Sequence, residues 1–213
     1  MKKLCILTVA ILIGMSTTIM AQENQNEYRS IFNKKSDQKI DHGGYGAFGV
    51  GYTTIASKDA ILLNFKGAWV INHNIALGFA GSSFFNNLDK TSTSPDEYLG
   101  GGYGGFYFEP IILSKSPVHL TFPVLIGGGA VSTIPKNYWD WDNNIYPYEY
   151  DIFFMVEPGV ELELNMVKFF RIALGASYRF TNGVVLNYTA GNEVPKDALD
   201  AFNFYINFKF GKF

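Results

Sequence analysis

The sequence predicts an all-β fold: an eight-stranded antiparallel up-and-down transmembrane β-barrel, preceded by a cleaved signal peptide. Three observations predict it. Eight segments alternate bulky apolar residues with small or polar ones, the period-two pattern of strands with one apolar face. Short connections gather at one rim and longer, polar ones at the other. The chain holds 19 Phe, 13 Tyr and 22 Gly and is 17% charged, below the roughly 25% of typical soluble domains.

Residues 1–21 predict a signal peptide for export. Two lysines precede an apolar run at 4–14, and small residues follow where cleavage is expected, so the mature chain begins near Gln22. A transmembrane helix is the alternative, but polar residues break the run and it lacks a stop-transfer flank. The single cysteine, Cys5, lies inside this signal, so we expect no disulfide and no cysteine metal site in the mature protein.

The mature chain divides into a polar N-terminal arm, residues 22–43, and an outer-membrane β-barrel, residues 44–213. The arm has no sustained apolar periodicity. No mature segment approaches the roughly 20 apolar residues that a spanning helix needs, so any membrane crossing would use strands. The formal net charge of −2 gives no basic footprint, which argues against nucleic acid as a partner.

Each expected strand separates a bulky apolar face from a face of small or polar residues. Segment 152–164 shows this most clearly, because Phe154 and Leu162 fall on one face and Glu161 and Glu163 on the other. Since a charge on the lipid face is costly, we expect the apolar face to point outward. The eight segments are 45–55, 61–71, 75–85, 98–110, 118–131, 152–164, 170–180 and 201–213.

Three places depart from this regular pattern. In segment 98–110, Leu99, Tyr103 and Tyr107 compete with Phe106 and Phe108 for the apolar face, and a bulge near Gly104 and Gly105 would reconcile them. In the last segment Phe213 is out of phase with Phe210, so either the strand ends there or a bulge at Gly211 shifts the phase. Pro123 and Pro158 each remove a ladder donor, and we expect them at similar heights on neighbouring strands, in a bulged or weakly paired seam.

The lengths of the connections favour a membrane barrel over a soluble one. A lipocalin-like carrier also alternates, but its Glu and Arg side chains would face solvent and its Phe-rich face would line a cavity. Short turns on one rim and long loops on the other are typical of outer-membrane barrels, with both termini periplasmic. The short connections are 72–74, 111–117 and 165–169; the long ones are 86–97, 132–151 and 181–200, and 56–60 is a short exception.

Charged residues on the inward faces predict an ionic network in the lumen. If a turn centred near Val167 joins the sixth and seventh segments, Glu163 lies opposite Arg171 and Glu157 lies diagonally from Arg179. Glu109 would extend the network. Because the interior of an eight-stranded barrel is narrow enough for side chains to fill, we expect a plugged lumen rather than an open pore. The predicted network residues are Glu157, Glu161, Glu163, Arg171, Arg179, Lys66 and Lys209.

The closing segment FNFYINFKFGKF resembles the C-terminal strand of outer-membrane barrels that the barrel assembly machinery recognises. The layout resembles the small OmpA/OmpX-type barrels. HGGYGAF, GAWVINHNIALGF and SPVHLTFPVLIGGGAV are similar to uncharacterised porin-like envelope proteins. The resemblance spans residues 42–213. It implies a Gram-negative outer membrane, with lipid and the assembly machinery as partners, and it carries no catalytic or binding residues.

The sequence predicts no enzyme, no cofactor and no metal site. His119 and Thr121 share an inward face and could belong to a hydrolase centre. They open their strand at the short-turn end and point inward, so we predict a buried hydrogen-bonding pair instead. The other two histidines, His42 and His73, lie in the arm and in a turn, away from His119.

The loop 137–151 is the most distinctive candidate surface, because it combines aromatic and acidic residues. Such a mixture suits sugar stacking or protein contact, although part of it could form the aromatic girdle of the barrel. The acidic spacing echoes a calcium loop, but Ile145 replaces the required glycine. The candidate binding residues are Tyr138, Trp139, Asp140, Trp141, Asp142, Tyr146 and Tyr148.

Taken together, these features predict a structural or surface-binding barrel that meets an unknown extracellular ligand through its loops. A narrow pore or small-solute transporter is the alternative. A lipid-modifying barrel enzyme and a soluble lipocalin-like carrier are the remaining candidates.

Overall fold

The computed structural model describes residues 40–86, 97–135, 149–187 and 193–213, which belong to one compact unit, Ile40–Phe213. The predicted signal peptide and nearly all of the predicted arm lie outside the described residues. The strands are β1 (His42–Ile55), β2 (Lys58–Ile71), β3 (Ile75–Phe85), β4 (Glu97–Ile112), β5 (Val118–Thr121), β6 (Val124–Pro135), β7 (Tyr150–Val167), β8 (Phe170–Thr181) and β9 (Ala201–Lys212).

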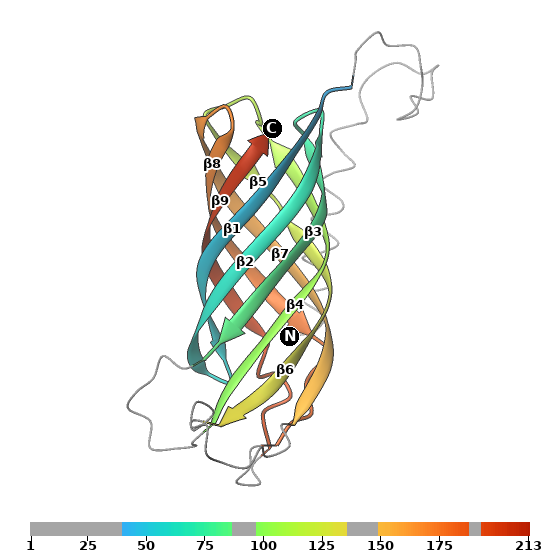
Figure 1. Cartoon of the computed structure of the whole chain (residues 1–213), viewed down its shortest axis with the longest axis vertical. Coiled ribbons are helices and arrows are strands. Elements are labelled where there is room, and N and C mark those ends of the chain that lie inside the picture. The colour runs from blue at the N-terminus through green and yellow to red at the C-terminus, as the bar shows by residue number, and fades with distance from the viewer. Residues whose placement is uncertain (1–39, 87–96, 136–148, 188–192) are drawn as a thin grey trace, which may run out of the picture. The chain divides into compact units, whose positions relative to one another are not determined.

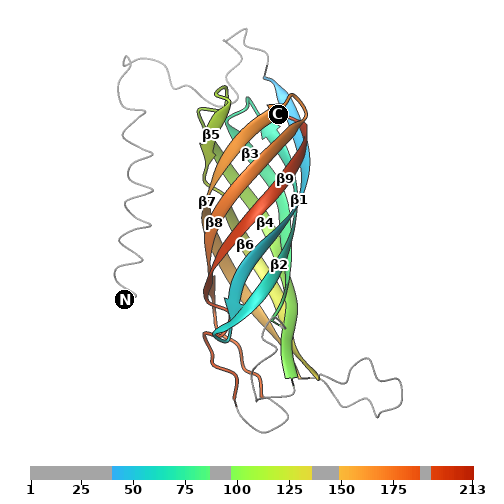
Figure 2. The ribbon, with the colours of Figure 1, turned by 90° about the vertical axis from the view of Figure 1, so that its left-hand side faces the viewer.

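These strands close into a ring, which confirms the predicted antiparallel eight-stranded barrel (Figures 1 and 2). β5 and β6 together fill one of the eight positions, between β4 and β7. They keep one register against β7, since Val118 pairs with Leu164 and Val124 with Pro158. Pairing of β1 with β9 closes the ring. No helix in the described part of the chain is long and apolar enough to cross a membrane.

The two ends of the barrel differ in their connections. The turns β2–β3, β4–β5 and β7–β8 lie at the end where β9 finishes, which is the upper end in Figure 1. We call this the turn end and the opposite one the loop end. At the loop end β1 and β2 are joined by Ala56 and Ser57, both with positive φ, as a two-residue type I′ hairpin turn requires. β1 begins at His42, two residues before the predicted start of the barrel.

The predicted division between apolar and polar faces is confirmed. Phe154 is 53% exposed on the outward face of β7, whereas Glu161 is fully buried on the inward face. On β4, Phe106 and Phe108 point outward, and Tyr103 and Tyr107 point inward. The predicted bulge near Gly104 is absent, because the register of β4 with β3 and β6 is unbroken there. The lumen accepts these tyrosines because β3 places small residues opposite them, Gly78 opposite Tyr107 and Ser82 opposite Tyr103.

Two further expectations about register are wrong. β9 continues past Phe210 with no bulge at Gly211, and Phe213 turns inward and stacks on Tyr45 with ring centroids 5.6 Å apart. The β7–β8 hairpin turns at residues 168–169 with a bulge between Asn165 and Val167. Because this turn is centred about one residue later than predicted, and the bulge then shifts the ladder by one residue, Arg171 lies opposite Asn165 instead of Glu163.

The two strand prolines do lie at neighbouring heights, as predicted. Val124, next to Pro123, pairs with Pro158, and the amide of Gly159 donates to the Pro123 carbonyl over 2.8 Å. Residues 157–158 drop out of the ladder with β8, and the register resumes unchanged at Gly159. Weak pairing along this seam stays a prediction.

Candidate functional site in the barrel lumen

The lumen contains all seven residues of the predicted ionic network, on the inward faces of four strands. Lys66 comes from β2, Lys209 from β9, and the arginines from β8. The three glutamates come from β7. The seven predicted loop residues at 138–148 lie outside the described residues. The candidate site is therefore the lumen.

Lys209 stands at the centre of the turn half of the lumen. Its ammonium is fully buried and lies 2.6 Å from Glu109 Oε1 and 2.8 Å from Glu161 Oε2, and it also pairs with Glu163. β9 and β4 are four positions apart in the ring of eight, so the Lys209–Glu109 pair joins opposite walls. The barrel is therefore braced through its interior as well as along its ladders.

A second brace crosses the lumen beside the first. Lys66 on β2 pairs with Glu161 on β7, and these strands also face each other across the ring. The Lys66 ammonium donates to the Tyr107 hydroxyl over 3.1 Å as well. Glu109 in turn accepts hydrogen bonds from Tyr45 at 2.5 Å and Thr121 at 2.8 Å. Lys66, Glu109 and Glu161 therefore each have partners on several strands, which is the condition under which buried ions are tolerated.

Glu163 links this centre to the turn end. Its Oε2 lies 2.9 Å from His119 Nε2 and 3.2 Å from Arg171 Nη1, so Glu163 and Arg171 meet diagonally although they are not directly opposed. The Arg171 guanidinium lies 3.9 Å from the centre of the Phe213 ring. We call these connected groups the Lys209 cluster: Lys66, Glu109, His119, Glu161, Glu163, Arg171 and Lys209.

The same three carboxylates have the spacing of a metal site. Oxygens of Glu109, Glu161 and Glu163 all lie within 4.8 Å of one another. Lys209 places its ammonium among them and supplies the positive charge that a cation would otherwise bring. Among the described residues, the lumen holds equal numbers of carboxylates and cations: Glu109, Glu157, Glu161 and Glu163, with Lys66, Arg171, Arg179 and Lys209.

The expected pair between Glu157 and Arg179 is not formed. Glu157 instead accepts a hydrogen bond from Ser177 at 2.5 Å. Arg179, fully buried, donates from Nε to the Leu199 carbonyl at 2.7 Å, and its guanidinium lies 5.1 Å from the centre of the Tyr103 ring. Arg179 therefore belongs with the loop half of the lumen and not with the Lys209 cluster.

Apolar side chains fill the loop half of the lumen, which the sequence analysis missed. Part of the connection 181–200, predicted as a long polar loop, packs on the strands and buries its own apolar residues. Asp151 and Glu149 anchor it by accepting the amides of Val185 and Asn187, each at 2.7 Å. The alternation of the apolar residues Val184 and Leu186 with their neighbours was the sequence feature that could have indicated this burial. We call this set the loop-end core: Ile55, Leu62, Leu99, Phe153, Met155, Val184, Leu186, Val194 and Leu199.

Little free volume is left between these two halves. A lumen cavity lined by residues of seven strands, among them Asn64, Tyr107 and Glu157, measures about 30 Å³. That is room for about one water molecule.

Comparison with known proteins identifies the fold. No family model and no curated protein matches the sequence. Among solved structures, Neisserial surface protein A (NspA) is similar with a TM-score of 0.56 and 8% identity, over 83% of this chain and 100% of that one. The N-terminal β-barrel domain of Pseudomonas aeruginosa OprF gives 0.48 and 10%, over 80% and 96%. Ail, the attachment invasion locus protein of Yersinia pestis, gives 0.49 and 10%, over 80% and 97%.

Proposed function

We propose that this chain, which has the predicted OmpA/OmpX-type fold of the small outer-membrane β-barrels, is a non-conducting, non-enzymatic barrel that serves as a rigid base for surface-binding loops. The observation that supports the proposal is that buried side chains of the Lys209 cluster and of the loop-end core occupy both halves of the lumen in the described part of the chain. A continuous path for solutes would have to pass both the Lys209 cluster and the loop-end core.

The fold and the outward faces support a location in the outer membrane. Phe65, Phe79 and Phe106 are 61%, 64% and 71% exposed on the outward face, and such rings are stable against acyl chains but not against water. The charged side chains of the spanning segments point to the lumen instead, as barrel thermodynamics requires.

The lumen supports a structural role better than a catalytic one. The carboxylates of the Lys209 cluster, His119 and Thr121 are all buried and bound to one another, so no nucleophile faces lipid or solvent there. General acid–base chemistry needs a group within reach of a substrate. Binding is therefore assigned to the loops, and the aromatic and acidic residues at 138–148 are the proposed contact surface.

Single-channel recording in planar bilayers tests the closed lumen. We expect no conductance steps from the wild-type chain. The pair E109A/K209A removes one brace and F153A/L199A opens the loop-end core, and each pair alone should stay silent because the other half still blocks the path. Only the combination of all four changes should conduct. Discrete steps from the folded wild-type protein would overturn the proposal and support the small-solute pore.

A glycan array with the refolded, fluorescently labelled chain tests the proposed contact surface. W139A/W141A should reduce any bound signal at least tenfold, because stacking on a sugar requires the indole rings. Y188A, an aromatic deletion in a different connecting segment, is the matched control and should bind like the wild type. Equal binding by both variants would remove residues 138–148 from the proposal.

A further inference from the structure

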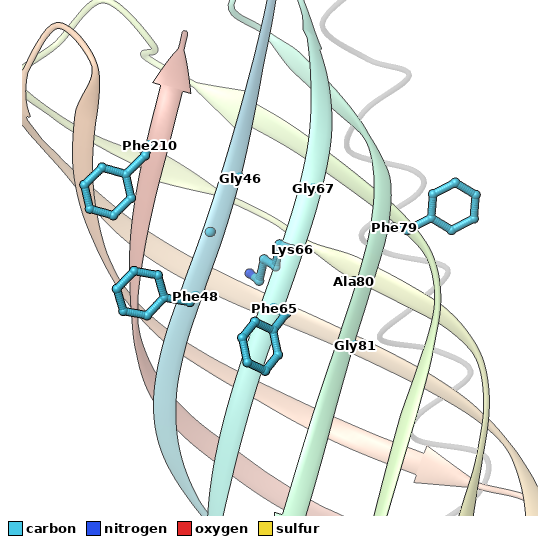
Figure 3. A pocket seen from close by; sticks show the side chains of 10 residues that line it. Gly46, Phe48, Phe65, Lys66, Gly67, Phe79, Ala80, Gly81 and Phe210 are labelled. Carbon is cyan, nitrogen blue, oxygen red and sulfur yellow. The ribbon is translucent and has the colours of Figure 1, made fainter.

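A hollow of about 690 Å³ interrupts the outward face of β1, β2 and β3. Its floor is formed where Gly46 and Gly67 pair directly with each other. The rings of Phe48, Phe65, Phe79 and Phe210 stand around it (Figure 3). The hollow is shallow and open on its outer side, so it suits a chain that lies along the surface of the barrel.

The usual structural reasons for glycine do not apply at these two positions. Among the described glycines only Gly183 has a positive φ, and the β1–β2 register runs unbroken through the Gly46–Gly67 pair. An added Cβ would meet nothing within 4 Å at either position, which holds for no other described glycine. At Gly175, by contrast, a Cβ would collide with the Tyr205 ring.

A glycine that weakens a strand without these reasons marks a place where another molecule approaches closely. The neighbouring outward positions strengthen this reading, because Phe48, Phe65 and Phe79 are bulky and 52 to 64% exposed. Side chains of that size at residues 46 and 67 would fill the hollow. Their absence leaves a smooth backbone floor within an aromatic rim.

We propose that this hollow binds one acyl chain of a phospholipid from the periplasmic leaflet. The hollow is continuous with the apolar outward band, which is the interface of the barrel with membrane lipid. Gly46 lies four residues from the start of β1, which is about 13 Å along the strand from the turn end. The turn end is periplasmic in this class of barrel, and the hydrocarbon core is about 30 Å thick.

Trp69 marks the level of the headgroups beside the hollow. It lies on the outward face of β2, two residues from Gly67 toward the turn end, and stacks on His42 with centroids 5.4 Å apart. Tryptophan of this kind gathers at membrane–water interfaces. An acyl chain that starts at this level and runs toward the bilayer centre would pass along the Gly46–Gly67 floor.

Native mass spectrometry of the full chain, refolded with palmitoyl-oleoyl phosphatidylethanolamine and then stripped by mild detergent, tests the proposal. We expect the wild type to retain one phospholipid per barrel. G46L/G67L should lower the retained fraction at least tenfold, because two leucine side chains fill the hollow. The free space around both positions predicts that this variant still folds, which heat-shifted migration on gels checks.

A130L/A176L is the matched control, because it places the same two leucine side chains at outward positions of β6 and β8 outside the hollow. It should retain lipid like the wild type. If G46L/G67L fails to fold, F48A/F65A takes its place as the test variant. It removes two rings of the rim and should also lower the fraction of barrels that retain a phospholipid. Retention unchanged in the folded variant, equal losses in the control, or no lipid on the wild type would each overturn the proposal.

Discussion

The two halves of the lumen are filled in opposite ways. At the turn end, several buried charges meet at Lys209, whereas at the loop end the apolar side chains of the loop-end core pack together with one buried cation, Arg179. The difference follows from the connections. A turn as short as residues 168–169 cannot fold back into the lumen. Long Lys, Glu and Arg side chains must therefore reach the lumen axis from the strands themselves. At the loop end the segment 182–200 is long enough to deliver Val184, Leu186 and Leu199 from outside the ring.

The largest effect should come from Lys209, because it compensates three carboxylates at once. Lys209→Met keeps the shape of the side chain but leaves Glu109, Glu161 and Glu163 without their shared cation. Removing one partner of a buried ionic group costs about 3–5 kcal/mol, and we expect the upper end of that range. Urea unfolding in lipid vesicles, followed by tryptophan fluorescence, measures it.

Lys212→Met is the control for that experiment, because Lys212 forms its ion pair on the exposed rim. Its effect should be much smaller. If both variants lost the same stability, the contrast between a buried centre and an exposed rim would be wrong.

In the loop half of the lumen, mutations should change stability through packing and not through charge. Leu199→Ala removes a fully buried side chain from the loop-end core, and Leu→Ala changes of this kind cost about 3 kcal/mol. The loss should be insensitive to salt and to pH. Vesicle unfolding at 0.05 and 1 M NaCl checks this, and a strong salt dependence would contradict an apolar origin.

The Phe213 ring should contribute less, because it is only half-buried at the turn end. Phe213→Leu keeps an apolar group there but removes the contact with the Arg171 guanidinium and the stacking on Tyr45. Cation–π and aromatic pairs of this kind are worth about 1 kcal/mol. Matching unfolding curves for Phe213→Leu and the wild type would show that the ring adds nothing beyond its apolar volume.

The smallest effect is expected at Asp41, on the exposed rim. The hydrogen bond from Lys212 and its charge, helped by His73, lower the pKa of Asp41 below its ordinary value of 3.8. A carboxyl with a lowered folded-state pKa stabilises the fold above its unfolded pKa, and that contribution is lost as the pH falls through the folded one. Asp41→Asn should therefore be slightly less stable than the wild type at pH 7 and equal to it well below pH 3.8. A gap that persisted in acid would rule out ionisation as its cause.

Much of the barrel could be predicted from the residues alone. Side chains in a strand alternate with a period of two, so the apolar face of each strand can be identified from that strand's own residues. This is why segments such as 152–164 and 170–180 were placed correctly, and why the charged residues were assigned to the lumen. The ambiguity of 98–110 arose because Tyr is both apolar and polar, and either face accepts it.

By itself, then, the sequence determined the strand count, the two faces, the closed ring and the set of charges inside it, because each depends on local periodicity and on the cost of a charge in lipid. The tertiary structure decided the partners: Lys209 reaches Glu109, Arg179 binds the Leu199 carbonyl instead of Glu157, and residues 182–187 and 193–200 place apolar side chains in the lumen. These depend on register and on which strands face each other across the ring. A one-residue bulge at Met166 changes the register of β7 with β8. The closure of the barrel fixes which strands face each other.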